Sequence, residues 1–453
     1  MKGDNMNHKK RGKMRMTKAS TLPELLYKFD DFALDNEESY DAYYVETSYA
    51  RGNDVSFRIS TRFHSIPEGF PKKILFMGHN GSGKTTELYK ISNQLQDRYV
   101  VVMFSIKKEL DIYRFNYVDL VFAILDNILE TAKKHNIKIK QSVIDNLYSY
   151  WNDEKILEVT KISKIAAEAN IEVKRNFLSL ISASIKGIFQ TGVESKETIR
   201  NKMEPSILQL MNYIDAIISD INLQLKGKEL LLIIEDLDKL DIQSGDDLFV
   251  FHRNILCNLN IPAIYTFPIY LYYTTKFKGI SDDFDHELLS MIKIKERDGS
   301  PCETGIKTLS EIVYKRADKN LFDDEALEFI IKKSGGAMRD IFNMITTSSL
   351  NALERINLNS SNTDQEKIIQ ISDAKKAFLT LKSGYERSIK QQFINVLNAV
   401  YNDPIKKPIE NEENVMQECL SSMLLIEYNG ERWCALHPAV ECYLKEKNLL
   451  INE

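Results

Sequence analysis

The sequence predicts an α/β fold in which helices cover a parallel β-sheet. Three apolar runs support this prediction, at residues 73–77, 98–105 and 229–235, and segments with helical periodicity separate them. Apolar runs without polar alternation are typical of strands buried on both faces, as strands of parallel sheets are. The first run passes into a glycine-rich loop and the third ends in acids, so we expect the functional site where these strands end.

The glycine-rich loop reads Gly-His-Asn-Gly-Ser-Gly-Lys-Thr over residues 78–85 and fills the pattern G-x-x-x-x-G-K-[ST], with a predicted helix over 85–95. Glycines in this pattern let backbone N–H groups curl around a phosphate without Cβ clashes, and the dipole of the following helix attracts the same anion. We therefore expect the loop to bind ATP. The predicted binding residues are Gly78, His79, Asn80, Gly81, Ser82, Gly83, Lys84, Thr85 and Thr86.

The acids Glu235 and Asp236 follow the third apolar run. In phosphate-loop enzymes the first such acid steadies the Mg²⁺ shell and the next polarises the attacking water. We expect Glu235 and the Thr85 hydroxyl to hold Mg²⁺ and Asp236 to act as the base. Lys84 would reach the β- and γ-phosphates, and Thr86 would support the α/β-phosphate end.

Composition excludes several classes of protein. The chain has 453 residues with 43% apolar and 28% charged side chains, which is typical of a globular protein of two to four domains. A net charge of −5 argues against a surface built as a whole for nucleic acid. Five cysteines without a C-x-x-C pair indicate a reducing compartment and no zinc site. Without an apolar run of about 20 residues or a signal-peptide core, we expect a cytoplasmic protein that does not enter a membrane.

Three segments outside the strands have competing interpretations. Residues 1–20 are rich in lysine and arginine and predict a disordered basic tail, with a nucleic-acid or acidic-partner arm as the alternative. Residues 22–70 are aromatic and acidic, and we expect them to pack onto the sheet or to form a wall for an adenine. Residues 138–228 predict a helical insertion, whose amphipathic middle at 177–189 packs on the core or else binds a membrane or a partner.

The region after the acids predicts two more strands and a set of helices. The fourth strand is expected at 261–268 and the fifth at 291–295, and helices follow at 308–316, 324–333 and 337–353. Ser334-Gly-Gly-Ala-Met-Arg-Asp340 joins the last two helices. Paired glycines end a helix there, and Arg339 lies in the first turn of the next.

The C-terminal part predicts helices at 388–401 and 414–423, then a hairpin whose Asn429-Gly430 pair is a strong two-residue turn signal. Pro438 begins a last helix. Helix, helix, hairpin and helix predict a winged-helix-like domain. The helix that would approach DNA carries acids, which repel phosphates, so we favour a docking or oligomerisation wing over DNA binding. These acids are Glu410, Glu412, Glu413 and Glu418.

With this loop and with Leu-Leu-Ile-Ile-Glu-Asp-Leu-Asp-Lys-Leu at 231–240, the chain resembles the AAA+ ATPases of the origin-recognition type and the bacterial STAND-like ATPases. The resemblance covers most of residues 40–445. It implies a polar γ-phosphate sensor on the fourth strand, here Thr266, and a second sensor in a helical lid, here Arg339. It also implies a core over 21–300, a lid over 301–382 and a winged-helix-like domain over 383–453.

The chain departs from the pattern of this family at two places. Glu235 stands where aspartate is usual, so we expect slow hydrolysis. Residues 267–290 contain no arginine, although many AAA+ proteins supply a trans-acting finger from there, and Arg253 or Arg297 are the substitutes. Binding of ATP is therefore the firmer expectation.

Three functional classes remain open. The first is an ATP-driven switch or remodeller that acts on a protein or nucleoprotein partner and forms a homo-oligomer, in bacterial defence or stress as the STAND-like resemblance implies. The second is a DNA-binding initiator or loader that uses the wing and the basic tail. The third is a small-molecule phosphotransferase, which has no use for a sensor arginine or a wing.

Overall fold

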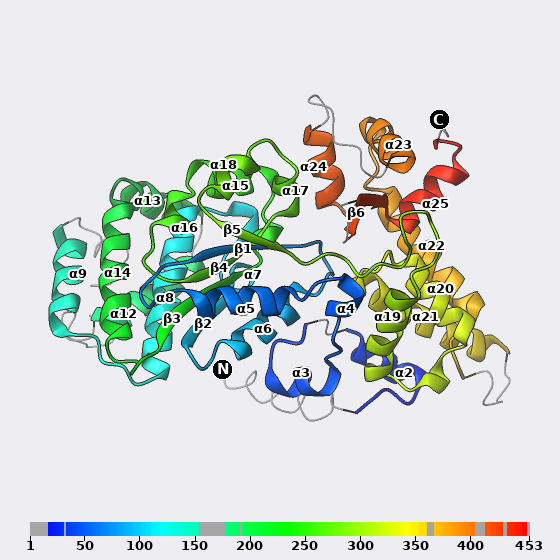
Figure 1. Cartoon of the computed structure of the whole chain (residues 1–453), viewed down its shortest axis with the longest axis horizontal. Helices are drawn as coiled ribbons and strands as arrows, with labels where there is room; N and C mark the ends of the chain where they lie inside the picture. Colours follow the sequence, from blue (N-terminus) through cyan, green and yellow to red (C-terminus); the bar gives the residue numbers. More distant parts are fainter. Residues whose placement is uncertain are drawn as a thin grey trace. The chain divides into compact units, whose positions relative to one another are not determined.

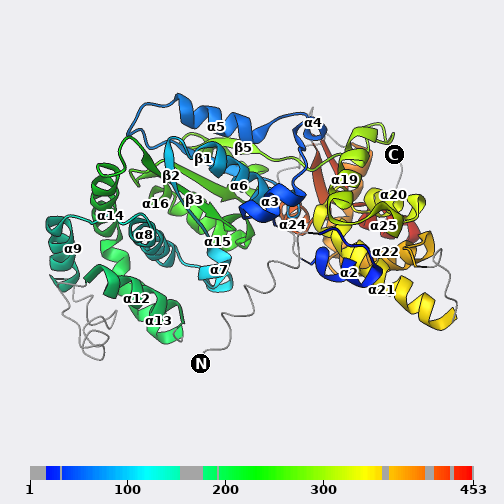
Figure 2. The ribbon, with the colours of Figure 1, turned by 90° about the horizontal axis from the view of Figure 1, so that it is seen from below.

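The structure of the protein is a computed structural model that describes residues 17–30, 33–153, 177–190, 193–359, 367–403, 413–428 and 433–450. The chain forms two compact units (Figures 1 and 2). The sheet unit contains residues 58–77 and 91–287. The lid unit contains residues 1–57, 78–90 and 288–453, so the phosphate loop belongs to it.

A five-stranded sheet is the centre of the sheet unit, with the order β2-β3-β4-β1-β5 (Figure 1). The paired strands among β1 to β4 run parallel, with Phe76 of β1 opposite Thr266 of β4 and Val101 of β2 opposite Leu231 of β3. Both β1 and β4 are buried over their whole length, which confirms the predicted α/β class. The strands are β1 Lys73–Met77, β2 Tyr99–Ser105, β3 Glu229–Glu235, β4 Ala263–Phe267 and β5 Asp285–Leu288.

The parallel pairing brings the carboxyl ends of β1, β4 and β3 to one edge of the sheet. At this edge β1 ends at Met77, directly before the phosphate loop in the chain, and β3 ends at Glu235. Ligands of open α/β sheets bind at such an edge. Thr266 lies on β4, which is hydrogen-bonded to β1 on one side and to β3 on the other.

The prediction of the fifth strand was wrong. It was expected at 291–295, but the strand is Asp285–Leu288, whose polar sequence lacks the apolar pattern used to find strands. An edge strand tolerates charge when the charge is paired. Glu287 accepts hydrogen bonds from Arg58 Nε at 2.9 Å and from an Arg62 guanidinium nitrogen at 2.8 Å, and both arginines lie on the neighbouring helix α5 (Val55–Ser65).

The predicted insertion is mostly helical where the structure describes it, and its helices lie side by side (Figures 1 and 2). The amphipathic segment forms α12, which buries Phe177, Leu180, Ile181 and Ile185 and packs on α8 and α9. Its apolar face is thus covered within the unit, as the core-packing interpretation predicts. The insertion contains α9 Gln141–Asp153, α12 Phe177–Gln190, α13 Val193–Met203 and α14 Ile207–Asn222, and α8 Tyr117–Lys134 precedes it.

The lid unit has a hydrophobic core made by its N-terminal residues and the lid helices. Phe29, directly after α2, contacts Phe342 of α21 edge-to-face, with ring centroids 5.0 Å apart. Ala19, which was expected in the basic tail, is buried and pairs with Ala317, while residues 1–16 of that tail lie outside the described residues. The helices are α2 Leu22–Lys28, α3 Glu37–Tyr43, α4 Ser48–Arg51, α19 Glu303–Arg316, α20 Asp324–Lys333, α21 Met338–Asn359 and α22 Ile371–Glu386.

The C-terminal elements occur in the predicted order of helix, helix, hairpin and helix. The first helix begins later than expected, after a short 3₁₀ turn, and the Asn429-Gly430 turn lies outside the described residues. Pro438 stands in the first turn of the last helix, and His437 caps that helix by accepting from the Ala439 N–H. The elements are α23 Ile394–Asn402, α24 Glu413–Ser421, β6 Leu425–Tyr428, β7 Trp433–Leu436 and α25 Pro438–Glu446.

The remaining helices are short, apart from α6, the helix that follows the phosphate loop. They are α6 Lys84–Gln94, α7 Ile106–Glu109, α15 Ile242–Asp246, α16 Asn254–Cys257, α17 Ile269–Tyr272 and α18 Phe277–Ser281. Within the described ranges, no helix combines the length and the apolar character that crossing a bilayer requires.

Truncation of the buried face of α12 tests whether the insertion belongs to the cooperative core. Ile181→Ala removes a side chain with 0% exposure, so the free energy of unfolding should fall by about 2–5 kcal/mol. Leu208→Ala on α14, where the side chain is 51% exposed, is the control and should change it by less than about 0.5 kcal/mol. Urea unfolding followed by tryptophan fluorescence measures both, since Trp151 is buried in the same unit. Equal midpoints for the two variants would show that α12 is not part of this core.

Candidate nucleotide-binding site

The phosphate loop has backbone angles that only glycine adopts freely. Gly81 and Gly83 have φ values of 78° and 98°. A Cβ atom on Gly81 would lie 3.2 Å from Arg339 Cβ, and one on Gly83 would lie 2.7 Å from Met338 Cε. The Met338 N–H also donates to the Gly81 carbonyl at 3.1 Å. The first turn of α21 therefore packs directly on the loop, and the glycines allow this close approach.

Two buried polar groups of the loop point to an anionic ligand. The Ser82 hydroxyl and His79 Nδ1 have no hydrogen-bond partner within the described ranges, although Ser82 is only 1% exposed and His79 2%. Buried polar atoms are normally satisfied. The first N–H groups of α6, which begins at Lys84, also lack partners inside the helix and favour an anion. These donors fit the phosphates of a nucleotide.

Lys84 is buried, and its ammonium group donates to the carbonyls of Gly78 at 2.6 Å and His79 at 2.9 Å. The loop thus folds around its own lysine. Thr85 follows in the first turn of α6, and the Thr86 hydroxyl accepts from the Leu34 N–H at 3.3 Å. The N-terminal segment is therefore attached to the helix that begins the site.

Beside Gly83 and Thr86 lies a small cavity of about 40 Å³, which holds little more than a water molecule. Tyr43 and Tyr44 line it, but a cavity of this size does not hold an adenine, and Phe57 is exposed and is not among the lining residues. The lining residues are Leu34, Tyr43, Tyr44, Val45, Thr47, Arg51, Gly83, Thr86, Glu87, Ile312, Arg316, Met338 and Phe342.

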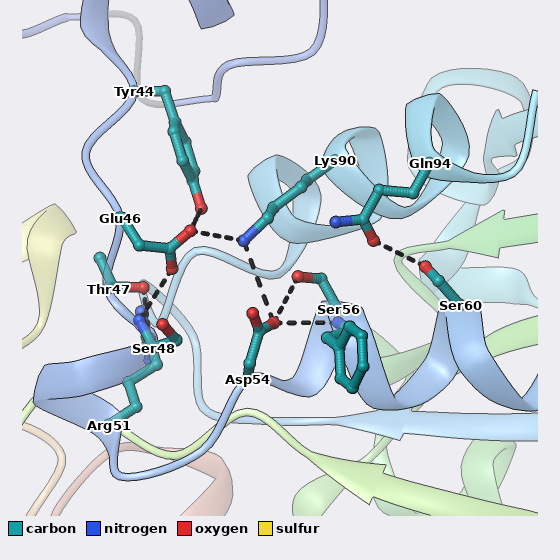
Figure 3. Close-up of polar contacts among 11 residues, drawn as sticks. Tyr44, Glu46, Thr47, Ser48, Arg51, Asp54, Ser56, Ser60, Lys90 and Gln94 are labelled. Carbon is teal, nitrogen blue, oxygen red and sulfur yellow. Dashed lines mark hydrogen bonds and ion pairs between the residues drawn. The ribbon is translucent and has the colours of Figure 1, made fainter.

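Arg51 is the clearest functional candidate that the sequence interpretation missed (Figure 3). Its buried guanidinium donates to the Thr47 hydroxyl at 2.9 Å, to the Ser82 carbonyl at 2.5 Å and to the Ser290 carbonyl. Burial lowers the pKa of Arg51 to about 10, so it stays charged at neutral pH. An arginine in an aromatic segment has no motif signal, and only the fold shows that it holds the loop.

A second set of charges joins the N-terminal segment to α6 (Figure 3). Glu46 pairs with Lys90 of α6 at 2.7 Å and accepts from the Tyr44 hydroxyl at 3.2 Å and the Ser48 N–H at 2.9 Å. Burial opposes the charge of Glu46, but the bonds from Lys90 and Ser48 outweigh it and lower its pKa to about 2. Asp54 lies 4.0 Å from the same ammonium. The segment is thus fixed along α6.

In the sheet unit, Glu235 ends β3 and is buried, and Asp236 follows with a left-handed φ of 68°. The Asp236 carboxylate accepts hydrogen bonds from the Ser105 hydroxyl at the end of β2 and from the Lys239 ammonium. Burial raises the pKa of Asp236, but the bonds from Lys239 and Ser105 outweigh burial and lower it below its usual value. The predicted base is therefore ionised and already paired.

Thr266 lies in β4 with its side chain buried, and its hydroxyl donates to the Ile234 carbonyl of β3 at 3.2 Å. The lone pairs of this hydroxyl stay available to accept from another donor. Thr266 thus lies on the strand where the sensor was expected, and its hydroxyl proton is donated to a carbonyl of the neighbouring strand.

Arg339 lies in the first turn of α21, after the paired glycines Gly335 and Gly336, whose φ values are 66° and 84°. This is the predicted position. The arginine is exposed, and together with Asn80 of the loop it lines a cavity of about 450 Å³. The lid unit thus brings Gly78 to Thr86 together with Arg339, and the sheet unit holds Glu235, Asp236 and Thr266 on adjacent strands.

The predicted magnesium ligands are one hydroxyl, Thr85, and one carboxylate, Glu235. Among the described residues, no group of three or more histidine, cysteine or acidic side chains could hold a metal ion. Each is an oxygen donor of the kind that Mg²⁺ prefers, and proteins bind this ion through one or two side chains together with phosphate oxygens and water.

Comparison with protein-family models gives no match, and comparison with curated protein sequences gives none either. Among solved structures, the chain is similar to a Walker-type ATPase of Pyrococcus abyssi, with 12% identity over 92% of this chain and 99% of that one and a TM-score of 0.41. It is similar to the ORC1 protein of Aeropyrum pernix, solved in complex with DNA, with 11% identity over 95% and 97% of the chains and a TM-score of 0.38. It is also similar to Cdc6p of Pyrobaculum aerophilum, with 9% identity over 89% and 99% and a TM-score of 0.35. Proteins of the origin-recognition type, which the motifs resemble, are thus among the structures found.

Proposed function

We propose that the chain binds and hydrolyses ATP with Mg²⁺, and that its nucleotide state switches its action on a protein or nucleoprotein partner. The phosphate loop is the observation that supports this most. Its positive-φ glycines, its buried and unsatisfied Ser82 hydroxyl and its buried Lys84 form a cradle for phosphates. The first turn of α21, with Arg339, packs on the same cradle.

In this proposal Lys84 binds the β- and γ-phosphates, and Thr86 supports the α/β-phosphate end. Thr85 and Glu235 hold Mg²⁺, which neutralises charge on the phosphates when bound. Asp236 polarises the attacking water, and Thr266 and Arg339 sense the γ-phosphate. The remaining loop residues contribute backbone N–H groups.

Hydrolysis should be slow without a partner. A general base must be within hydrogen-bond reach of the water and able to take its proton. Asp236 is instead hydrogen-bonded to Ser105 and Lys239, so these hydrogen bonds must break before its carboxylate can accept a proton from water. A partner that rearranges them would stimulate turnover.

The packing of lid residues on the loop favours a switch over a small-molecule phosphotransferase, because a lid contact changes when the loop binds phosphate. A role in bacterial defence or stress, and assembly into a homo-oligomer, belong to the same proposal. For the DNA-binding initiator, the acids Glu413 and Glu418 on α24 are unfavourable, since they repel the phosphate backbone.

DNA titrations with and without ATP distinguish the initiator from the switch. Affinity that falls steeply with salt and rises with ATP would support the initiator. Formation of a phosphorylated small molecule would instead support the phosphotransferase.

Lys84→Ala should abolish ATP binding. Each charge-assisted hydrogen bond that the ammonium makes contributes about 1.5–3 kcal/mol, so we expect the affinity to fall by at least about 100-fold. Calorimetric titration with ATP and Mg²⁺ measures this, and Lys133→Ala, at an exposed position on α8, is the control for the loss of one positive charge. Equal ATP affinity of the two variants would show that Lys84 of the phosphate loop does not bind the nucleotide.

Asp236→Asn should keep ATP binding and stop turnover, because the amide cannot accept a proton from water. We expect the rate of phosphate release to fall by about 10²–10⁴-fold at unchanged affinity. Asp238→Asn, two positions away, is the control and should hydrolyse ATP like the original chain. Undiminished hydrolysis by Asp236→Asn would exclude it as the base. The mass of this variant in solution with ATP and Mg²⁺ also tests assembly, which a monomer under those conditions would contradict.

A further inference from the structure

His79 joins the phosphate loop to the C-terminal hairpin. Its Nε2 atom accepts a hydrogen bond at 2.8 Å from the backbone N–H of Glu427 in β6, 348 positions along the chain. Because Nε2 is the acceptor, the ring proton is assigned to Nδ1. Burial, and then the charge of Lys84, lower the pKa of His79 to about 3, so the ring is neutral and stays an acceptor.

The same residue also binds the loop lysine. The His79 carbonyl accepts from Lys84 Nζ at 2.9 Å, next to the Gly78 carbonyl at 2.6 Å. One residue therefore contacts the hairpin with its side chain and the proposed phosphate-binding lysine with its backbone. A change in the position of Lys84 alters the hydrogen bonds of the residue that holds the hairpin.

The hairpin is attached at a second place, the glycine turn before Arg339. The Tyr428 hydroxyl donates to the Gly335 carbonyl at 2.8 Å, and Tyr428 forms a β-bridge with Met291. Met291, Ala337, Ile426 and Tyr428 belong to one buried cluster. The hairpin thus contacts the phosphate loop and the turn that places the predicted sensor.

Two residues outside the hairpin, His437 and Tyr385, contact the segment on both sides of Arg339. His437 Nε2 lies 3.0 Å from the Ser334 carbonyl and 3.1 Å from an Asp340 carboxylate oxygen. The Tyr385 hydroxyl donates to that same oxygen at 2.7 Å, and the Tyr385 ring stacks on His437 with centroids 4.1 Å apart. The position of Arg339 therefore depends on the C-terminal elements.

We propose that the hairpin β6–β7 is a regulatory clamp on the nucleotide site, that its docking on His79 opposes nucleotide binding, and that nucleotide binding weakens the docking. The inference rests on the proposed function. A bound triphosphate takes the Lys84 ammonium away from the carbonyls of Gly78 and His79, so the loop loses the arrangement to which the hairpin is fitted. Coupling between two binding events is reciprocal, so loosening the hairpin must tighten ATP binding.

Two substitutions at His79 test its contact with the hairpin. The amide of His79→Gln reaches about as far as Nε2 and can still accept from the Glu427 N–H. The amide of His79→Asn reaches only as far as Nδ1 and loses that contact. We expect the Glu427 amide to exchange about 5–30-fold faster in His79→Asn than in His79→Gln, within the usual range of coupling. The ATP affinities of these two variants do not test the clamp, because both replace Nδ1, a predicted donor to the phosphates.

A third variant leaves the loop unchanged. Tyr428→Phe removes the hydroxyl that binds the Gly335 carbonyl and keeps the ring in its cluster. It should tighten ATP binding by about 2–10-fold, because it loosens the hairpin at its other attachment. This variant keeps the proposal testable if changes at His79 prevent folding.

Hydrogen exchange of the Glu427 amide reports docking directly. In the original chain without nucleotide this amide should be protected, and ATP should increase its exchange rate, whereas the same amide in His79→Asn should exchange fast under both conditions. If the original chain binds ATP but its Glu427 exchange does not change, or if Tyr428→Phe binds ATP no more tightly, the clamp is excluded while the proposed function stands. If the original chain does not bind ATP at all, the proposed function itself fails.

Discussion

The close contact between the phosphate loop and the first turn of α21 is the constraint on which the rest of the lid unit depends. Met338 and Arg339 approach within 2.7–3.2 Å of the positions that Cβ atoms on Gly83 and Gly81 would take. Side chains at these two positions would strain the positive φ angles of the loop and collide with Met338 and Arg339. The conformation of the loop and the position of the lid are therefore coupled by steric exclusion, which acts over the full range of salt and pH.

The loop also needs hydrogen-bond partners, because its short backbone belongs to neither a helix nor a strand. Two segments that are distant in sequence supply partners to the loop backbone, and a third binds the His79 side chain. Arg51 binds the Ser82 carbonyl, Met338 donates to the Gly81 carbonyl, and the Glu427 N–H donates to His79. This explains why the loop groups with the N-terminal, lid and C-terminal residues in one compact unit, although the chain places it directly after β1.

The sequence allowed prediction of the features that a local pattern specifies. The apolar runs predicted β1 to β4, the loop motif predicted a strand, a turn and a helix, and the paired glycines placed Arg339 at a helix start. β5 was missed because its acids are satisfied by Arg58 and Arg62, which no local pattern of hydrophobicity can show. The contacts of Arg51 and of the His79 ring depend on partners hundreds of residues away, or on carbonyls, which carry no sequence signal.

Two of the charged groups that the proposed chemistry requires are paired within the protein. Lys84 is bonded to two loop carbonyls, and Asp236, held at a positive φ that is rare for aspartate, is bonded to Ser105 and Lys239. A ligand gains only the difference between its own bonds and those that it replaces. Small differences then decide occupancy, so a contact of about 1–3 kcal/mol from a partner or from the hairpin suffices to shift the equilibrium. A protein whose binding lysine and catalytic aspartate are already hydrogen-bonded is suited to regulation more than to rapid turnover. ATP binding and activation of the water each require existing hydrogen bonds to break first.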